Sequence, residues 1–214
     1  MKVSSLMMFG VATAMVVGAA GCNDGVGMGL APLDQPAMIV ANSAQPQSQV
    51  TVYHQGALDP SASLTVLKVE NGFVRLRSDK EQATVEQLIF LLADAELAPS
   101  TSMPLGVKLR NQRLALDAPL SAEVSDKSMN GLTAHAHGSL TYRADLLDED
   151  GRLRPLGPVP TDAADFDVRA TRYEFGVHVT VDAAPQGTCW KIPGVLDISN
   201  CSLYVAMDGD SISN

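Results

Sequence analysis

The feature that most constrains the fold is a strict alternation of apolar and polar side chains over residues 132–146. Every second residue is apolar or small, and the residues between them are polar. Side chains of a β-strand point alternately to its two faces, so the alternation predicts antiparallel strand structure with one buried and one hydrated side. Residues 168–182 repeat the pattern, and their predicted buried face is Tyr173, Phe175, Val177, Val179 and Val181.

Shorter strand patterns and turn signals occupy much of the rest of the chain. Strands are predicted over residues 50–54, 64–70, 105–109 and 202–207. Asn71-Gly72 is a strong hairpin signal, because both positions of a tight hairpin turn favour positive φ, and it predicts a turn that pairs Val69 with Val74. About eight short strands separated by turns are typical of an antiparallel β-sandwich or barrel-like domain, so the predicted fold class is mainly β.

Residues 79–97 fit two structures. Ser78 and Glu81 have the spacing of a helix capping box, and Val85, Leu88 and Leu92 recur at helical spacing. The same segment also fits the period of two that a strand shows. We favour one helix near residues 79–97 and keep a strand as the alternative.

The charge of the chain limits the class of partner. The 214 residues carry a formal net charge of −9, and the sequence contains no basic run. Proteins that bind nucleic acid neutralise its phosphates with Lys and Arg, so nucleic acid is not an expected partner. A chain of this length can bury a substantial core, and one domain is expected.

The first 22 residues carry an export signal. Lys2 precedes an uncharged apolar run over residues 6–20, and small residues lead to a cysteine in Ala19-Ala20-Gly21-Cys22. This layout is typical of a secretory signal. The last four residues resemble the lipobox of bacterial lipoproteins, although Ala19 stands where that family usually has Leu. An ordinary cleaved signal, with Cys22 as a free thiol or a disulfide partner, is the alternative.

The lipoprotein resemblance implies cleavage before Cys22, acylation of that cysteine with chains such as palmitate, and a lipid anchor in the cell envelope. Two or three acyl chains give durable anchorage. Asn23 stands where an Asp often retains such proteins in the inner membrane, so the outer membrane is the expected location. An envelope protein is a candidate partner.

The composition after Cys22 predicts a tether followed by one domain. Residues 22–49 are rich in Gly, Pro, Gln and Ser and are expected to be flexible, except that Met38-Ile39-Val40 fits a short edge strand. Residues 50–214 are expected to form a single β-rich domain.

Cys189 and Cys201 are predicted to form a disulfide. Export leads to an oxidising compartment, and the third cysteine is the predicted lipid site. The short loop between the two cysteines suggests a stabilisation of about 2–3 kcal/mol. Trp190 is expected to pack over the bond. A metal site formed by the two cysteines is the alternative. Their spacing, with no His nearby, does not match a zinc signature.

A cluster of histidines is the candidate metal site. His135 and His137 are two residues apart, so they project from the same face of a strand. His178 lies on the polar side of the other long alternating segment. If the two segments paired, three imidazoles could converge on zinc or copper, with Glu174 as a further ligand. The alternative is three ordinary residues on a hydrated sheet face, in which case no cofactor is expected.

The sequence offers no catalytic constellation. Asp148-Glu149-Asp150-Gly151 has the acidity of a calcium loop but lacks two of the ligands an EF-hand needs, so a hairpin turn is expected there. The expected function is a non-catalytic binding or structural module of the envelope, and the chain is not expected to be an enzyme. A metal-binding envelope protein is the alternative function.

Overall fold

The computed structural model describes residues 30–43, 49–54, 64–79, 81–96, 106–185, 188–192 and 196–213. Within these ranges every regular element is a strand. The 14 strands are β1 (Ala37–Ser43), β2 (Gln49–His54), β3 (Leu64–Ser78), β4 (Gln82–Leu92), β5 (Ala95–Glu96), β6 (Lys108–Ala115), β7 (Leu120–Lys127), β8 (Gly131–Gly138), β9 (Thr141–Leu147), β10 (Leu153–Pro160), β11 (Ala164–Tyr173), β12 (Gly176–Pro185), β13 (Thr188–Ile192) and β14 (Leu196–Ser213).

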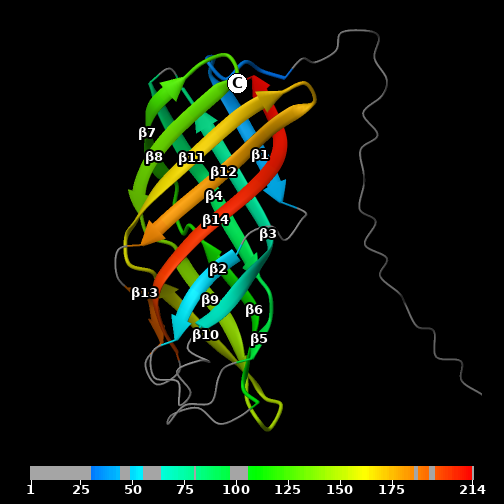
Figure 1. The fold of residues 1–214 in the computed structure, drawn as a ribbon, viewed down its shortest axis with the longest axis vertical. Coiled ribbons are helices and arrows are strands. Elements are labelled where there is room, and N and C mark those ends of the chain that lie inside the picture. The colour runs from blue at the N-terminus through cyan, green and yellow to red at the C-terminus, as the bar shows by residue number, and fades with distance from the viewer. Residues whose placement is uncertain are drawn as a thin grey trace, which may run out of the picture.

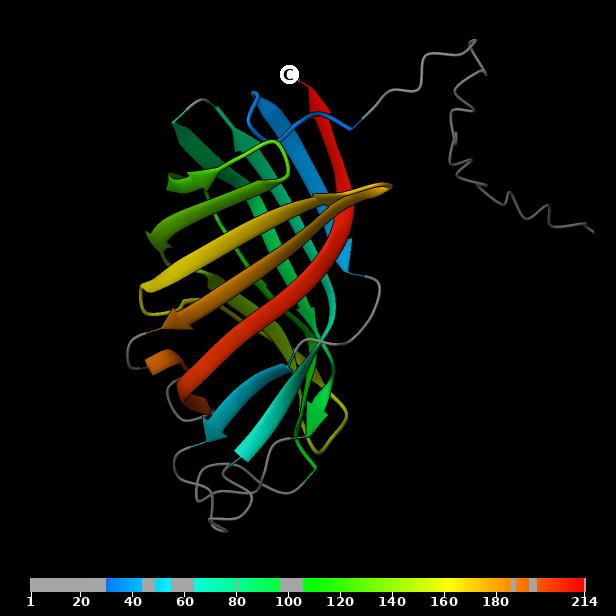
Figure 2. The same ribbon diagram turned by 45° about the horizontal axis from the view of Figure 1, so that its top comes forward.

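Eight of these strands close an antiparallel barrel. The order around it is β1, β3, β4, β7, β8, β11, β12 and β14, and β14 then pairs with β1 to complete the ring. The strands cross the barrel wall obliquely in Figures 1 and 2, as closure of a small barrel requires. The expected fold class, mainly β with a barrel-like domain, is confirmed.

Three long strands run past the closed barrel and make a second set of pairings. β4 pairs with β7 through residues 82–85 and with β6 through residues 89–92. β2 pairs with the outer parts of β3 and β14, while β9 and β10 follow β6. The molecule is therefore elongated, with the closed barrel at the upper end and these added strands at the lower end of Figure 1.

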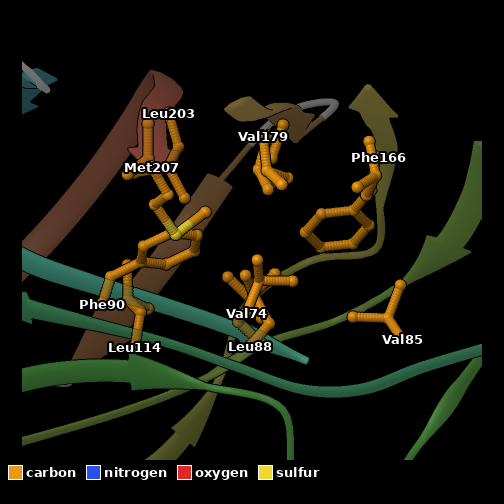
Figure 3. Close-up of a cluster of buried hydrophobic side chains, with 14 of the residues drawn as sticks. Val74, Val85, Leu88, Phe90, Leu114, Phe166, Val179, Leu203 and Met207 are labelled. Atoms are coloured by element: carbon orange, nitrogen blue, oxygen red, sulfur yellow. The ribbon is translucent and has the colours of Figure 1, made fainter. Parts of the chain in front are cut away.

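Apolar side chains fill the barrel. The close-up in Figure 3 shows Phe90, Phe166, Val179 and Met207 directed toward one another from different strands, and all four are buried. An eight-stranded barrel has an interior just wide enough for such side chains. Each Val, Leu or Phe that is fully buried contributes about 1.5–3 kcal/mol. This interior is a structural core.

The segment over residues 79–97 is strand, so the predicted helix is wrong. β4 contains an irregularity in its pairing with β3, where Arg75 is opposite Gln87 but Leu76 is opposite Val85. Glu86 is the extra residue of this bulge, and after it the side chains that face the core are shifted by one position along the strand. The resulting three-residue step from Val85 to Leu88 imitates a helical period. The buried residues of β4 are Ala83, Val85, Leu88, Phe90 and Leu92.

The predicted hairpin at Asn71-Gly72 is also wrong, because both residues lie inside β3. The register between β3 and β4 shifts beside Asn71, so the pair marks a bulge. A Cβ atom on Gly72 would lie 2.9 Å from Cγ1 of Val205 and 3.3 Å from Sδ of Met207. The glycine is needed for the close approach of these core side chains rather than for a positive φ.

The alternating segment over residues 132–146 forms two strands, β8 in the closed barrel and β9 beside β6. The chain leaves one set of pairings for the other at Ser139-Leu140. Thr161 fixes this crossing, because its Oγ1 accepts a hydrogen bond from Leu140 N at 2.9 Å and its backbone N donates to Leu140 O at 2.8 Å. The predicted alternation is correct, although one strand was expected.

Residues 37–43, which the sequence assigned to the tether, form β1. This strand is part of the barrel wall, so it is not an edge strand. β1 pairs with β3 on one side and β14 on the other. Ile39 and Ala41 are buried in the core, and so is Leu33 just before the strand. The domain therefore includes Ala31, Leu33 and β1, all of which precede Val50.

Candidate functional site

The outer face of β7, β8 and β11 carries the two predicted histidines. His135 and His137 point outward from β8 while Ala134 and Ala136 between and beside them are buried, as the alternation predicted. The side chains of His135 and His137 are 49% and 70% exposed. Both imidazoles are therefore accessible from outside the barrel.

Each of these histidines is paired with a carboxylate of β11. The antiparallel register sets His135 opposite Asp167 and His137 opposite Asp165. Nδ1 of His135 lies 2.5 Å from Oδ1 of Asp167, and Nδ1 of His137 lies 2.8 Å from Oδ1 of Asp165. An ionised carboxylate only accepts hydrogen bonds, so Nδ1 is the donor in both pairs. In a neutral imidazole this leaves Nε2 as an acceptor or a metal ligand.

A shallow hollow of about 820 Å³ lies over this face. Besides the two histidine–aspartate pairs, Gln82, Ser121 and Glu123 line it. Glu123 is directly opposite His135 on the other neighbouring strand, so His135 has a carboxylate-bearing residue on each side. We call this surface the histidine–carboxylate face.

His178 does not join the other two histidines. β11 lies between β8 and β12, so the pairing of the two alternating segments that a three-histidine cluster required is wrong. His178 is opposite Asp208 of β14, and Nδ1 lies 2.9 Å from Oδ1 of that residue. Glu174 lies in the turn between β11 and β12. Among the described residues, no three His, Cys, Asp or Glu side chains are grouped to hold a metal ion.

The aspartates are the residues that sequence reasoning missed. Asp165 and Asp167 alternate with the buried Ala164, Phe166 and Val168 along β11. That alternation is visible in the sequence, but it begins at Ala164, four residues before the predicted alternating segment over residues 168–182. Their pairing with the histidines depends on the strand order, which the sequence did not specify.

These pairs sit in a hydrated environment, which limits what each contributes to stability. Asp167 is 36% exposed and Asp165 is 67% exposed. Even a charged pair with this exposure contributes only about 0–1 kcal/mol. The pairs therefore orient the rings rather than hold the barrel together, and the paired strands β7, β8 and β11 lie beneath them.

The remaining predicted site residues lie outside the described part of the chain or have no described side chain. Cys22 precedes residue 30, where the description begins. Cys189, Trp190 and Cys201 lie in β13 and β14, but only their backbone is described. The lipidation and the disulfide stay predictions. The described residues include no helix with the length and hydropathy needed to cross a membrane.

Comparison of the chain with known protein families, with curated proteins and with solved structures found no match.

Proposed function

We propose that this chain is a membrane-anchored envelope lipoprotein whose β-barrel is a non-catalytic binding or structural module. The observation that carries the proposal is the export signal that ends in Ala19-Ala20-Gly21-Cys22, which resembles a lipobox. The predicted lipid site is also close in sequence to the barrel. Leu30, the first described residue, stands eight positions after Cys22, and the backbone of Ala31 is already hydrogen-bonded to Ser211 of β14. An acylated Cys22 would therefore hold the barrel near the membrane surface.

The anchor is tested by metabolic labelling with palmitate and membrane fractionation in a bacterial host. The full chain should take up the label and fractionate with the envelope, and Cys22→Ser should lose both properties. Asn23→Ser, next to the predicted cleavage site, is the matched control and should keep the label. Label retained by Cys22→Ser would contradict the anchor.

The non-catalytic role is supported by the position of the polar residues. The core is filled with apolar side chains, and the histidine–carboxylate face is open to water. Ser121 lines the same hollow as His137 and Asp165, so ester hydrolysis is the reaction to assay first. If the purified barrel hydrolyses an ester and His137→Ala abolishes that activity, the protein is an enzyme and the proposed non-catalytic role is wrong.

A second candidate function is binding of zinc or copper through His135 and His137. The observation that favours it is the carboxylate on Nδ1 of each ring. Metal-binding histidines almost always donate their other ring N–H to a carboxylate or carbonyl, which fixes the tautomer that ligates. The two imidazoles on one strand face are ligands of the kind that zinc and copper bind, and water or another molecule would have to complete the coordination.

Titration of the soluble barrel with zinc and copper tests this candidate. Binding should be lost in a His135→Ala/His137→Ala double variant and kept in His178→Ala. The latter is a matched control, because His178 has the same kind of aspartate partner on a different strand pair. Equal binding by the three proteins would rule out the face as the metal site.

A further inference from the structure

The segment that follows the predicted lipid site meets the barrel at one end of its long axis. Ala31 N donates a hydrogen bond to Ser211 O at 3.1 Å, and Leu33 N donates to Met129 O at 3.0 Å. Met129 lies in the turn between β7 and β8, and Ser211 lies near the end of β14. Figures 1 and 2 both show these segments, together with the β11–β12 turn, at the end where the C-terminus lies. We call it the anchor-side end.

Exposed apolar side chains gather at the anchor-side end. Phe175, in the β11–β12 turn, is 79% exposed, and Ile212, Met129 and Tyr173 are 58%, 56% and 45% exposed. The alternation predicted Phe175 and Tyr173 as buried residues of a continuous strand, but the chain turns at Glu174-Phe175 and leaves Phe175 at the tip. Phe175 is the most exposed large hydrophobic residue in the described part of the chain. Exposed apolar side chains that gather at one place, unlike single ones, mark sites of protein or membrane contact.

The length of the link limits what can lie against this end. Eight residue steps separate Cys22 from Leu30, and a fully extended chain spans at most about 3.3–3.6 Å per residue. An acylated Cys22 would therefore hold the anchor-side end within roughly 30 Å of the lipid. The bilayer surface is the apolar phase within that reach.

We infer that the rim formed by Met129, Tyr173, Phe175 and Ile212 inserts into the surface of the bilayer that holds the lipid anchor. The inference rests on the proposed function. Phe and Tyr side chains suit the boundary between headgroups and acyl chains, since an aromatic ring is apolar and the tyrosine hydroxyl stays hydrated. Each side chain alone binds a bilayer weakly, but the anchor makes insertion an intramolecular step with a high effective concentration.

The charges around the rim select the kind of lipid. Glu174 is adjacent to Phe175 in the turn, and Asp208 and Asp210 are exposed on the neighbouring part of β14. Carboxylates are repelled by an anionic surface. Arg172, next to Tyr173, and Lys127, two residues before Met129, are basic, so the charge around the rim is mixed. A rim of mixed charge fits a leaflet of zwitterionic headgroups.

The experiment places a tryptophan at the rim and one at the opposite end of the full lipidated protein. Phe175→Trp tests the rim, and Ile212→Trp is a second rim position. Leu153→Trp is the matched control, because Leu153 is 56% exposed and begins β10, beside the turn at the far end of the molecule in Figures 1 and 2. The parental protein, with its single Trp190, supplies the background fluorescence. Each protein is incorporated into phosphatidylcholine vesicles with and without brominated acyl chains.

We expect brominated chains to quench the added fluorescence of Phe175→Trp and Ile212→Trp at least twofold and to leave that of Leu153→Trp unchanged. Flotation of the vesicles separates the two levels of the argument. Protein that floats while both rim tryptophans stay unquenched overturns the inference and leaves the anchor intact. Equal quenching at the rim and at Leu153→Trp overturns it too, because the barrel would then lack a preferred end. Protein that does not float contradicts the proposed function itself.

Discussion

Tyr142 joins three elements through a buried polar chain of hydrogen bonds. The side chain is fully buried, and its hydroxyl donates to Oε1 of Gln112 at 2.7 Å. Nε2 of Gln112, which is also buried, donates to Ala93 O at 2.6 Å. The two bonds tie β9 to β6 and to the residues that follow β4. Buried polar groups in such a chain depend on one another for their partners.

Removing the hydroxyl should therefore destabilise the domain. In Tyr142→Phe the Oε1 atom of Gln112 loses the hydroxyl donor, and a buried acceptor left without a partner costs about 1–3 kcal/mol. Urea denaturation of the soluble barrel, followed by circular dichroism, measures the loss. A variant as stable as the parent would mean that water or another donor replaces the hydroxyl.

The same residue makes stability depend on alkaline pH. Burial raises the pKa of the Tyr142 hydroxyl above its ordinary value. Above about pH 10 the unfolded chain releases this proton while the folded chain keeps it, so the free energy of unfolding falls as the pH rises. The slope from one group approaches about 1.4 kcal/mol per pH unit. Between pH 9 and 11, the free energy of unfolding of Tyr142→Phe, measured by urea denaturation, should fall less steeply with pH than that of the parent. Equal slopes would show that Tyr142 does not cause the pH dependence.

Gly209 allows β1 and β14 to approach closely. A Cβ atom at this position would lie 1.9 Å from Val40 O and 2.5 Å from Cα of Ala41, and both contacts are with backbone. Backbone of a closed barrel has little room to shift, so Gly209→Ala should cost about 3 kcal/mol or more. Gly131→Ala is the control, because the nearest atom is the mobile Oγ of Ser128 at 3.2 Å. Similar urea midpoints for the two variants would show that β1 can move.

At the scale of the element, β1 closes the barrel. Without it, the parts of β3 and β14 that it joins become unpaired edges, and the buried Leu33 and Ile39 are lost from the core. Burial of each contributes about 1.5–3 kcal/mol, and exposed strand edges promote aggregation. A soluble chain that starts at Val50 should therefore aggregate, whereas one that starts at Leu30 should be monomeric and unfold cooperatively.

Gel filtration and thermal unfolding compare the two chains. If the chains that start at Leu30 and at Val50 are both folded monomers, residues 30–49 are dispensable, as the composition of that segment predicted. The composition was misleading because Pro and Gln residues surround β1. Only three alternating residues of β1, Ala37, Ile39 and Ala41, face the core, so the strand pattern is short.

The strands could be predicted from the sequence where every second residue faces the core along the whole strand. β8, β11 and β12 have this pattern, and their buried alanines and valines were recognisable. β4 does not, because the extra residue Glu86 interrupts the alternation and produced the false helical period. A bulge depends on how neighbouring strands twist and pair, and a single strand pattern carries little of that information.

The candidate site could be predicted only in part for the same reason. The alternation correctly placed His135 and His137 on one outer face. Their partners Asp165 and Asp167 depend on β11 being the neighbour of β8. That neighbour is fixed by the closure of the whole barrel, in which β8 pairs with β7 and β11 rather than with β12.

At the scale of the whole molecule, the long axis separates two surfaces. The rim lies at the anchor-side end, whereas the histidine–carboxylate face lies on the side of the barrel, on β7, β8 and β11 in Figure 1. With the rim in the bilayer surface, the axis would stand away from the membrane and the face would be open to molecules diffusing in the envelope. The two proposals are therefore compatible.

The length of the link between Cys22 and the barrel should control how much of the protein has its rim inserted. Insertion of a Gly/Ser stretch of roughly 20 residues between residues 29 and 30 lowers the effective concentration of the rim at the bilayer. For a flexible link this concentration falls as about the −3/2 power of its length, so the change from about 8 to about 28 residues reduces it roughly sixfold. The lipid anchor itself is unaffected. Quenching of Phe175→Trp by brominated lipid should therefore fall while flotation stays complete, and undiminished quenching would show that the link does not position the barrel.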